Sequence, residues 1–329
     1  MINRKLFFAG LDLGGTFLKY AIGNQNGTVI YKGKRPSRAD QSQQEVFKVM
    51  FEAVHELLGV ADKHKGVLAA IGVGSPGAID FENGRLIGST PNIQHWENAD
   101  IRAQLEAEFS IPVWADNDAN IMAFAEARHG AAEGGKNVIC ATLGTGIGGG
   151  ILIDGELYRG KNYTAGEIGH MAIVHNGLPC NCGSRGCFEQ YASAPAMVRH
   201  YAEILEANGK KLPKDVSTVT IFANAAAGEK EAQQAIDVTV DYLGTGFASL
   251  ANIFNPEIIV IGGGVAEAGE EFIAKIRENV FSKAMKPTLK DLKIVRATLG
   301  NDAGFIGAII LAAEMYFKSK KRFYRFKIF

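Results

Sequence analysis

Residues 10–31 read GLDLGGTFLKYAIGNQNGTVIY: two apolar, alternating segments joined by a glycine-rich bend and followed by a turn at Asn26-Gly27. This pattern predicts a strand, a tight loop, a second strand, a turn and a third strand. Residues 141–158, ATLGTGIGGGILIDGELY, repeat the pattern and close with a turn at Asp154-Gly155. The repetition predicts a chain of two related halves, each built on a hairpin with a glycine bend.

The composition is that of a globular α/β protein. The chain has 329 residues, of which 47% are hydrophobic and 39 are glycine, and this length favours two domains with a cleft between them. Lys+Arg and Asp+Glu both number 35, so no overall field draws the chain to nucleic acid or to an anionic membrane. Asp12 interrupts the early apolar run, so this run is too short for a secretory signal and we expect a cytoplasmic protein. The apolar stretch 305–317 is too short to cross a bilayer, so we expect it to form a packed helix.

The rest of the chain alternates strands and helices. Apolar residues at helical spacing predict a helix over 43–64, and the segments 67–80 and 257–264 predict buried strands that run into glycine turns. Residues 190–250 are mostly helical in pattern, with a further strand near 293–300.

The glycine bends suit phosphate binding. GTGIGG at 144–149 satisfies the dinucleotide pattern G-x-G-x-x-G, but a predicted strand follows it instead of a helix, which argues against a Rossmann site, and no Walker A loop is present. Exposed N–H groups in a bend between strands can still bind phosphate, although each bend alone could be a simple hairpin. A third glycine turn, IGGGVAEAG at 261–269, follows a buried strand, and together the three predict a nucleotide site.

Three of the four cysteines lie within the segment 166–190, GEIGHMAIVHNGLPCNCGSRGCFEQ. Cys180, Cys182 and Cys187 with His170 provide a Cys₃His set that suits tetrahedral Zn²⁺, the alternative being free or disulfide-linked thiols. Four protein ligands leave no position for water, so such a metal is structural. It would fix two carboxylates, Glu167 and Glu189, against one another. We expect His175 at the surface, Cys140 in the core and Trp96 as a candidate core residue.

Two aspartates in VWADNDAN at 113–120 compete for an acid–base role. Asp116 and Asp118 both follow a predicted strand and precede a predicted helix. A carboxylate there could accept a proton from an attacking hydroxyl, but Asp118 could equally serve only as the cap of the helix.

The motifs together resemble a known family. LDLGGTFLKYAI, LGTGIGGG and IGGG resemble the phosphate-1, phosphate-2 and adenosine motifs of the actin-like ATPase and sugar kinase superfamily. With GSPGAID, TPNIQHW, DNDAN, GEIGH and CNCGSRGCFEQ added, residues 8–315 resemble the ROK family (repressors, open reading frames, kinases), in particular its glucokinase-like members. The resemblance implies a two-domain α/β fold of the actin-like ATPase, sugar kinase (ribonuclease H-like) type with an interdomain cleft. We expect 1–119 plus 305–329 to form the smaller domain, and 120–304 the larger domain with the zinc-binding loop.

The resemblance also implies roles for individual residues. Asp118 matches the catalytic Asp, and Asp116 would support the turn. Asp12 would lie near Mg²⁺, through water, unless it only caps the hairpin; Lys19 could contact phosphate or be an exposed strand residue. The implied sugar-binding residues are Gly77, Asn92, Asn117, Asp118, Glu167, His170 and Glu189. The implied ATP-binding residues are Asp12, Gly14, Gly15, Thr16, Gly144, Thr145, Gly146, Gly262, Gly263 and Gly264, and the implied zinc ligands are His170, Cys180, Cys182 and Cys187.

The implied activity is that of an ATP- and Mg²⁺-dependent hexose kinase, specifically a glucokinase that makes glucose 6-phosphate, acting as a homodimer or higher homo-oligomer. Kinases for N-acetylmannosamine, fructose or allose share these motifs, and polyphosphate could replace ATP. A sugar-sensing regulator of the same family would need an N-terminal helix-turn-helix, for which the start of GLDLGGT at Gly10 leaves no room. A zinc hydrolase would need an exchangeable water on the metal.

Overall fold

The computed structural model describes residues 4–88, 90 and 93–326. The chain divides into two compact units. The first consists of Met1–His129, Arg159–Ala165 and Asn301–Phe329, and the second of Gly130–Tyr158 and Gly166–Gly300. The domain bounds expected from the sequence, 1–119 with 305–329 and 120–304, stay a prediction.

The first unit contains a five-stranded mixed sheet of order β3-β2-β1-β4-β7. β1 pairs with β2 and β2 with β3 in antiparallel fashion, while β1, β4 and β7 run parallel. The strands are β1 (Lys5–Leu13), β2 (Phe17–Gly23), β3 (Val29–Pro36), β4 (Gly66–Ser75) and β7 (Val113–Asn117).

The second unit repeats this topology with the order β10-β9-β8-β11-β12. β8 again pairs antiparallel with the strand that follows it and parallel with β11. The strands are β8 (Val138–Leu143), β9 (Ile147–Ile153), β10 (Glu156–Leu157), β11 (Ile258–Gly262) and β12 (Lys293–Arg296). The prediction of two related halves is thus confirmed.

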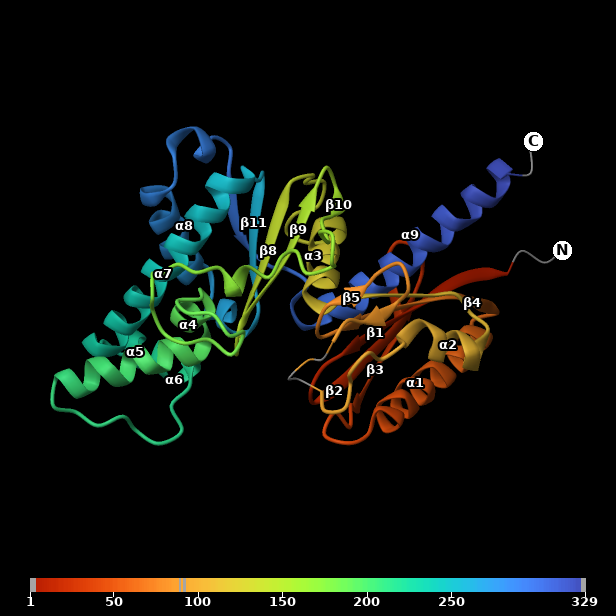
Figure 1. The fold of residues 1–329 in the computed structure, drawn as a ribbon, viewed down its shortest axis with the longest axis horizontal. Helices are drawn as coiled ribbons and strands as arrows, with labels where there is room; N and C mark the ends of the chain where they lie inside the picture. Colours follow the sequence, from red (N-terminus) through yellow and green to blue (C-terminus); the bar gives the residue numbers. More distant parts are fainter. Residues whose placement is uncertain (1–3, 89, 91–92, 327–329) are drawn as a thin grey trace. The chain divides into compact units, whose positions relative to one another are not determined.

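Alternation along β1 divides the first unit into two cores. Phe7, Leu11 and Leu13 point to the face covered by α1 (Gln43–Lys63) and α2 (Ile101–Phe109), while Phe8 packs with α9 (Ala303–Phe326) on the other face (Figure 1). A Cβ on Gly10 or Gly72 would collide with backbone carbonyls of α9, so these two glycines let the helix rest directly on the sheet. The predicted helix over 43–64 and the packed helix over 305–317 are therefore confirmed.

Helices cover one face of the second sheet. Ile139, Leu143 and Ile261 form a core with Met197 and Phe247 from the helical region predicted at 190–250. The helices of this unit are α4 (Glu189–Ala192), α5 (Ala194–Ala207), α6 (Thr218–Ala226), α7 (Lys230–Phe254) and α8 (Glu270–Lys283). The remaining elements are β5 (Ile79–Asp80), β6 (Arg85–Leu86), α3 (Asp118–His129), η1 (Ile168–His170), η2 (Gly264–Ala268), η3 (Lys286–Leu289) and η4 (Gly300–Asp302). Within the described ranges, every helix is too short or too polar to cross a membrane.

Candidate active site

Residues 116–118, where β7 meets α3, form a turn that we call the base turn. It carries the candidate base, Asp118. The side-chain oxygen of Asn117 accepts hydrogen bonds from the backbone N–H groups of Ala119, at 2.9 Å, and Asn120, at 3.1 Å. These are the contacts of a helix cap, so Asn117 caps α3 and Asp118 is its first helical residue. The interpretation that Asp118 serves only as the cap is wrong, because the neighbouring asparagine has that role.

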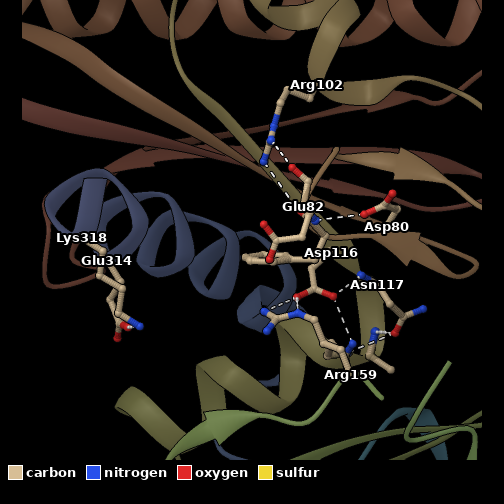
Figure 2. Close-up of polar contacts among 11 residues, drawn as sticks. Asp80, Glu82, Arg102, Asp116, Asn117, Arg159, Glu314 and Lys318 are labelled. Atoms are coloured by element: carbon tan, nitrogen blue, oxygen red, sulfur yellow. Dashed lines mark hydrogen bonds and ion pairs between the residues drawn. The ribbon is translucent and has the colours of Figure 1, made fainter. Parts of the chain in front are cut away.

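Both carboxylate oxygens of Asp116 make contacts that hold this turn. It is buried, and its Oδ1 accepts from the N–H of Asn117 at 2.8 Å and from Nδ2 of Asn120 at 3.1 Å. Its Oδ2 accepts from Nε of Arg159 at 2.8 Å and pairs with a terminal guanidinium nitrogen of that residue at 2.6 Å (Figure 2). Asp116 therefore supports the turn. Asp118 is half-buried, and its Oδ1 accepts a hydrogen bond from the backbone N–H of Ala119 at 2.9 Å.

A backbone loop at the end of β4 lies beside the same turn. Nδ2 of Asn117 donates to the carbonyl of Gly77 at 3.0 Å, and Gly77 has a φ of 93°, which favours glycine. The structure thus brings together three of the residues expected to bind sugar, namely Gly77, Asn117 and Asp118. Asn92, a fourth, lies outside the described residues.

Asp12 lies opposite Lys19 in the β1–β2 hairpin, with Oδ2 3.8 Å from the ammonium nitrogen. Burial raises the pKa of the Asp12 carboxyl, and the charge of Lys19 opposes that shift. Lys19 also donates to the carbonyl of Asn301 at 3.2 Å. The bend after Asp12 is closed by a hydrogen bond from the N–H of Gly14 to the carbonyl of Phe17, and Gly15 and Thr16 are exposed at its tip.

Gly304, in the first turn of α9, is packed against the Asp12 carboxylate. A Cβ on this glycine would come within 2.7 Å of Oδ1 of Asp12 and closer still to Cγ and Oδ2. The position of Asp12 therefore depends on the absence of a side chain at residue 304.

Two glycine segments lie side by side in the second unit. β8 and β11 are parallel neighbours, with Gly262 in register with Thr142, so the segments that follow them, 144–146 and 262–264, lie at the same edge of the sheet. Gly263 has a φ of 85°, and a Cβ there would collide with the Leu143 carbonyl. Thr145 and Gly264 are exposed.

The four candidate zinc ligands converge within the second unit. One donor atom from each of His170, Cys180, Cys182 and Cys187 lies within 4.8 Å of all the others. Sγ of Cys182 is 3.6 Å from Sγ of Cys187, and Sγ of Cys180 is 3.6 Å from Nδ1 of His170. Thiolates bound to one tetrahedral Zn²⁺ are about 3.8 Å apart, so the donor set fits this metal.

The protonation of the thiols depends on their surroundings. Burial raises the pKa of Cys187 to about 12 and also raises that of Cys180, whereas hydrogen bonding from the backbone of Ser184 lowers the pKa of the exposed Cys182. Buried thiols of this kind become thiolates only beside a cation.

Glu189 connects this cluster to a glycine bend. Its Oε1 accepts from the thiol of Cys180 at 3.4 Å and lies 3.7 Å from Nδ1 of His170. A Cβ on Gly146 would come within 2.8 Å of its other oxygen. The other expected carboxylate, Glu167, is exposed and directly precedes η1, which carries His170. His175 is exposed, while Cys140 and Trp96 are buried, as expected.

Sequence patterns alone do not reveal two contacts of the first unit. The guanidinium of Arg159 pairs with Asp116 and stacks 3.7 Å from the centre of the Phe81 ring. Gly304 packs against the carboxylate of Asp12. The single available signal for Arg159 was the buried aspartate itself, which requires a cationic partner.

The model of the ROK family matches residues 8–315. The chain belongs to the ROK family. The glucokinase of Halalkalibacterium halodurans is 37% identical over 309 residues, covering 92% of this chain and 93% of that protein. Xylose repressors also match, at 28 to 30% identity, and the chain spans 77 to 79% of their length.

Solved structures of ROK proteins have the same fold. The ROK hexokinase of Thermus thermophilus superimposes with a TM-score of 0.80 at 32% identity, covering 96% of this chain and 99% of that one. The ROK glucokinase of Streptomyces griseus, in complex with glucose and AMPPNP, gives a TM-score of 0.76 at 30% identity, covering 94% and 99% of the two chains. The fold is therefore the α/β actin-like ATPase fold of ROK sugar kinases, as the resemblance implied.

Proposed function

We propose that this protein is an ATP- and Mg²⁺-dependent hexose kinase whose substrate is glucose and whose product is glucose 6-phosphate. The observation that carries the proposal is the base turn, in which Asp116 is buried and paired with Arg159 while Asp118, two residues later, begins a helix. The 37% identity with a glucokinase supports glucose as the sugar.

Asp118 has the position of a general base. A carboxylate at a helix N-terminus is stabilised in its ionised form by the helix dipole. In the proposed reaction Asp118 accepts the proton of the sugar hydroxyl as the hydroxyl oxygen bonds to the γ-phosphorus of ATP, and the bond from that phosphorus to the bridging oxygen breaks to release ADP. Accepting the proton contributes about 10²- to 10⁴-fold in rate. Asn117, Gly77, Asn92, Glu167, His170 and Glu189 are proposed to bind the sugar.

The remaining catalysis is electrostatic. Phosphoryl transfer depends on neutralising charge on the phosphate oxygens, which Mg²⁺ and backbone N–H groups can do. Asp12 is proposed to hold Mg²⁺ through water. The glycine bends at 14–16, 144–146 and 262–264 are proposed to bind ATP, because the exposed residues at their tips, Gly15, Thr16, Thr145 and Gly264, can present backbone N–H groups to an anion.

The Cys₃His cluster is proposed to hold Zn²⁺. The metal would supply four bonds that fix the loop 170–187, and with all four ligands from the protein it has no hydrolytic role. Because Glu189 contacts His170 and Cys180, the cluster would set the position of that carboxylate.

The substitution Asp118→Asn tests the proposal. It should lower kcat for glucose by at least about 10²-fold, because the amide cannot accept the proton, while glucose binding measured by calorimetry persists. Asp62→Asn, which changes an exposed aspartate in α1, is the matched control and should leave kcat unchanged. Near-normal turnover in Asp118→Asn would refute the assignment of the base.

A panel of sugars and donors tests the substrate. Glucose, fructose, allose, mannose and N-acetylmannosamine would be assayed with ATP and with polyphosphate in a coupled assay. A higher kcat/KM for glucose with ATP is the expected result. Sugar binding without turnover on any member of the panel would instead favour a regulator, the function named for the related xylose repressors.

A further inference from the structure

Residues 159–165, which we call the clamp loop, belong to the first unit although they lie in sequence between two segments of the second. The loop follows β10 and is closed by a hydrogen bond from the N–H of Ala165 to the carbonyl of Arg159 at 3.1 Å. Tyr163 has a φ of 59°, an unfavourable value for a non-glycine residue, which indicates that tertiary contacts fix the loop.

Two side chains anchor the clamp loop. The guanidinium of Arg159 makes two contacts with Oδ2 of Asp116, at 2.8 and 2.6 Å, and stacks on the ring of Phe81. Tyr163 hydrogen-bonds to Asp80, the residue next to Phe81 in sequence. Figure 2 shows the guanidinium of Arg159 facing the Asp116 carboxylate beside Asn117.

The Arg159–Asp116 ion pair is largely buried. Asp116 has 1% of its side chain exposed and Arg159 has 18%. Removing one partner of a buried ion pair leaves an uncompensated charge, which the protein relieves by admitting water or a proton. Either change would disturb Oδ1 of Asp116, which accepts a hydrogen bond from the backbone N–H of Asn117. Asn117 immediately precedes Asp118.

We propose that Arg159 is a positioning residue for phosphoryl transfer: by pairing with Asp116, it holds the turn that places the Asp118 carboxylate for proton transfer. The inference rests on the proposed function, since it assumes that Asp118 is the base. The clamp loop is followed in sequence by Gly166 and Glu167, which belong to the second unit.

The experiment compares Arg159→Met with a matched control, Arg102→Met. Arg102 also lies in the first unit and, like Arg159, contacts Phe81. Its guanidinium, however, donates to the backbone carbonyls of Val113 and Phe81 instead of the Asp116 carboxylate. Arg159→Met should lower kcat about 10- to 100-fold, because a displacement near 1 Å is enough for such a loss, with the KM for MgATP within about threefold of wild type. Arg102→Met should lower the melting temperature, because it removes the hydrogen bonds to Val113 and Phe81, and should keep the wild-type kcat.

A double variant separates positioning from general damage. If Arg159 acts through Asp118, adding Arg159→Met to Asp118→Asn should lower the residual kcat no further, measured with labelled ATP to reach low rates. The proposal is overturned if Arg159→Met retains kcat within threefold of wild type, or if it lowers the rate of Asp118→Asn by the same factor as it lowers that of wild type.

One further variant keeps the test decisive. If Arg159→Met does not fold, Arg159→Lys carries the test: it keeps the charge but loses the two-point geometry, so kcat should fall about 3- to 10-fold. A wild-type kcat in Arg159→Lys would then reject the proposal. Full activity of Asp118→Asn would reject Asp118 as the base, and wild-type protein without turnover on any sugar of the panel would reject the proposed function. An inactive Asp118→Asn with a fully active Arg159→Met would reject the role of Arg159 alone.

Discussion

Gly304→Ala is expected to separate catalysis from stability in the first unit. The new Cβ would come within 2.7 Å of Oδ1 of Asp12 and closer still to two other atoms of that side chain, whereas ordinary contacts begin at 3.4 Å. The carboxylate must therefore retreat by about 1 Å, a displacement that can cost about 10²-fold in rate when it affects a positioned group. Because Asp12 is the proposed partner of Mg²⁺, the loss should appear in kcat/KM for MgATP.

The effect on folding should be much smaller. Alanine is favoured over glycine in a helix by up to about 1 kcal/mol, and crowding of a packed site costs about 1–3 kcal/mol, so the two largely offset. The displaced atoms also belong to the end of one short side chain, which has 19% of its area exposed and can turn. Because these two effects oppose one another, we expect the free energy of unfolding to change by less than about 2 kcal/mol.

The assay would measure initial rates over a range of MgATP at saturating glucose, together with thermal unfolding. Gly59→Ala is the matched control, because this exposed glycine lies in α1 with open space around its Cβ position. The control should raise the melting temperature and leave kcat/KM unchanged. The reasoning would be refuted by a Gly304→Ala protein with wild-type kcat/KM for MgATP.

Two further results are expected. Burial raises the pKa of Asp12, so the ionised carboxylate costs folding free energy above its folded-state pKa and not below its unfolded value. Asp12→Asn should therefore raise the melting temperature at pH 7.5, with the gain shrinking as the pH falls toward about 4, and a lower melting temperature at pH 7.5 would contradict this. Cys182→Ser should lower the amount of bound zinc, measured by mass spectrometry. It should also raise the KM for both glucose and MgATP, because Glu189 contacts the cluster and lies against Gly146. A rise in the KM for glucose alone would argue against a coupling between the cluster and the glycine bend.

The elements that the sequence predicted well are those with local signals. The repeat of hairpin and glycine bend could be read because Asn26-Gly27 and Asp154-Gly155 mark turns by their own backbone chemistry. The observed strand orders, β3-β2-β1-β4-β7 and β10-β9-β8-β11-β12, follow from that repeat. The thiol cluster was also predictable, since all four donors lie within residues 170–187.

The cap of α3 shows where a local signal becomes ambiguous. Residues 116–120 read DNDAN, and aspartate and asparagine are both good helix caps. Sequence alone could not choose among them, because the choice depends on which residue has the non-helical backbone. The structure assigns the cap to Asn117 through its two hydrogen bonds to Ala119 and Asn120, and so leaves Asp118 inside the helix.

Partners that are distant in sequence account for what remained hidden. Asp116 and Arg159 are separated by 43 positions, and no periodicity links them. This contact distinguishes the two aspartates of the turn, which residue type alone cannot do. One is buried, holds Arg159 and gives both oxygens to structure, whereas the other starts a helix beside a capping asparagine. The clamp loop therefore distinguishes the supporting aspartate from the proposed base, so the proposed assignment of the base depends on residues that no local motif contains.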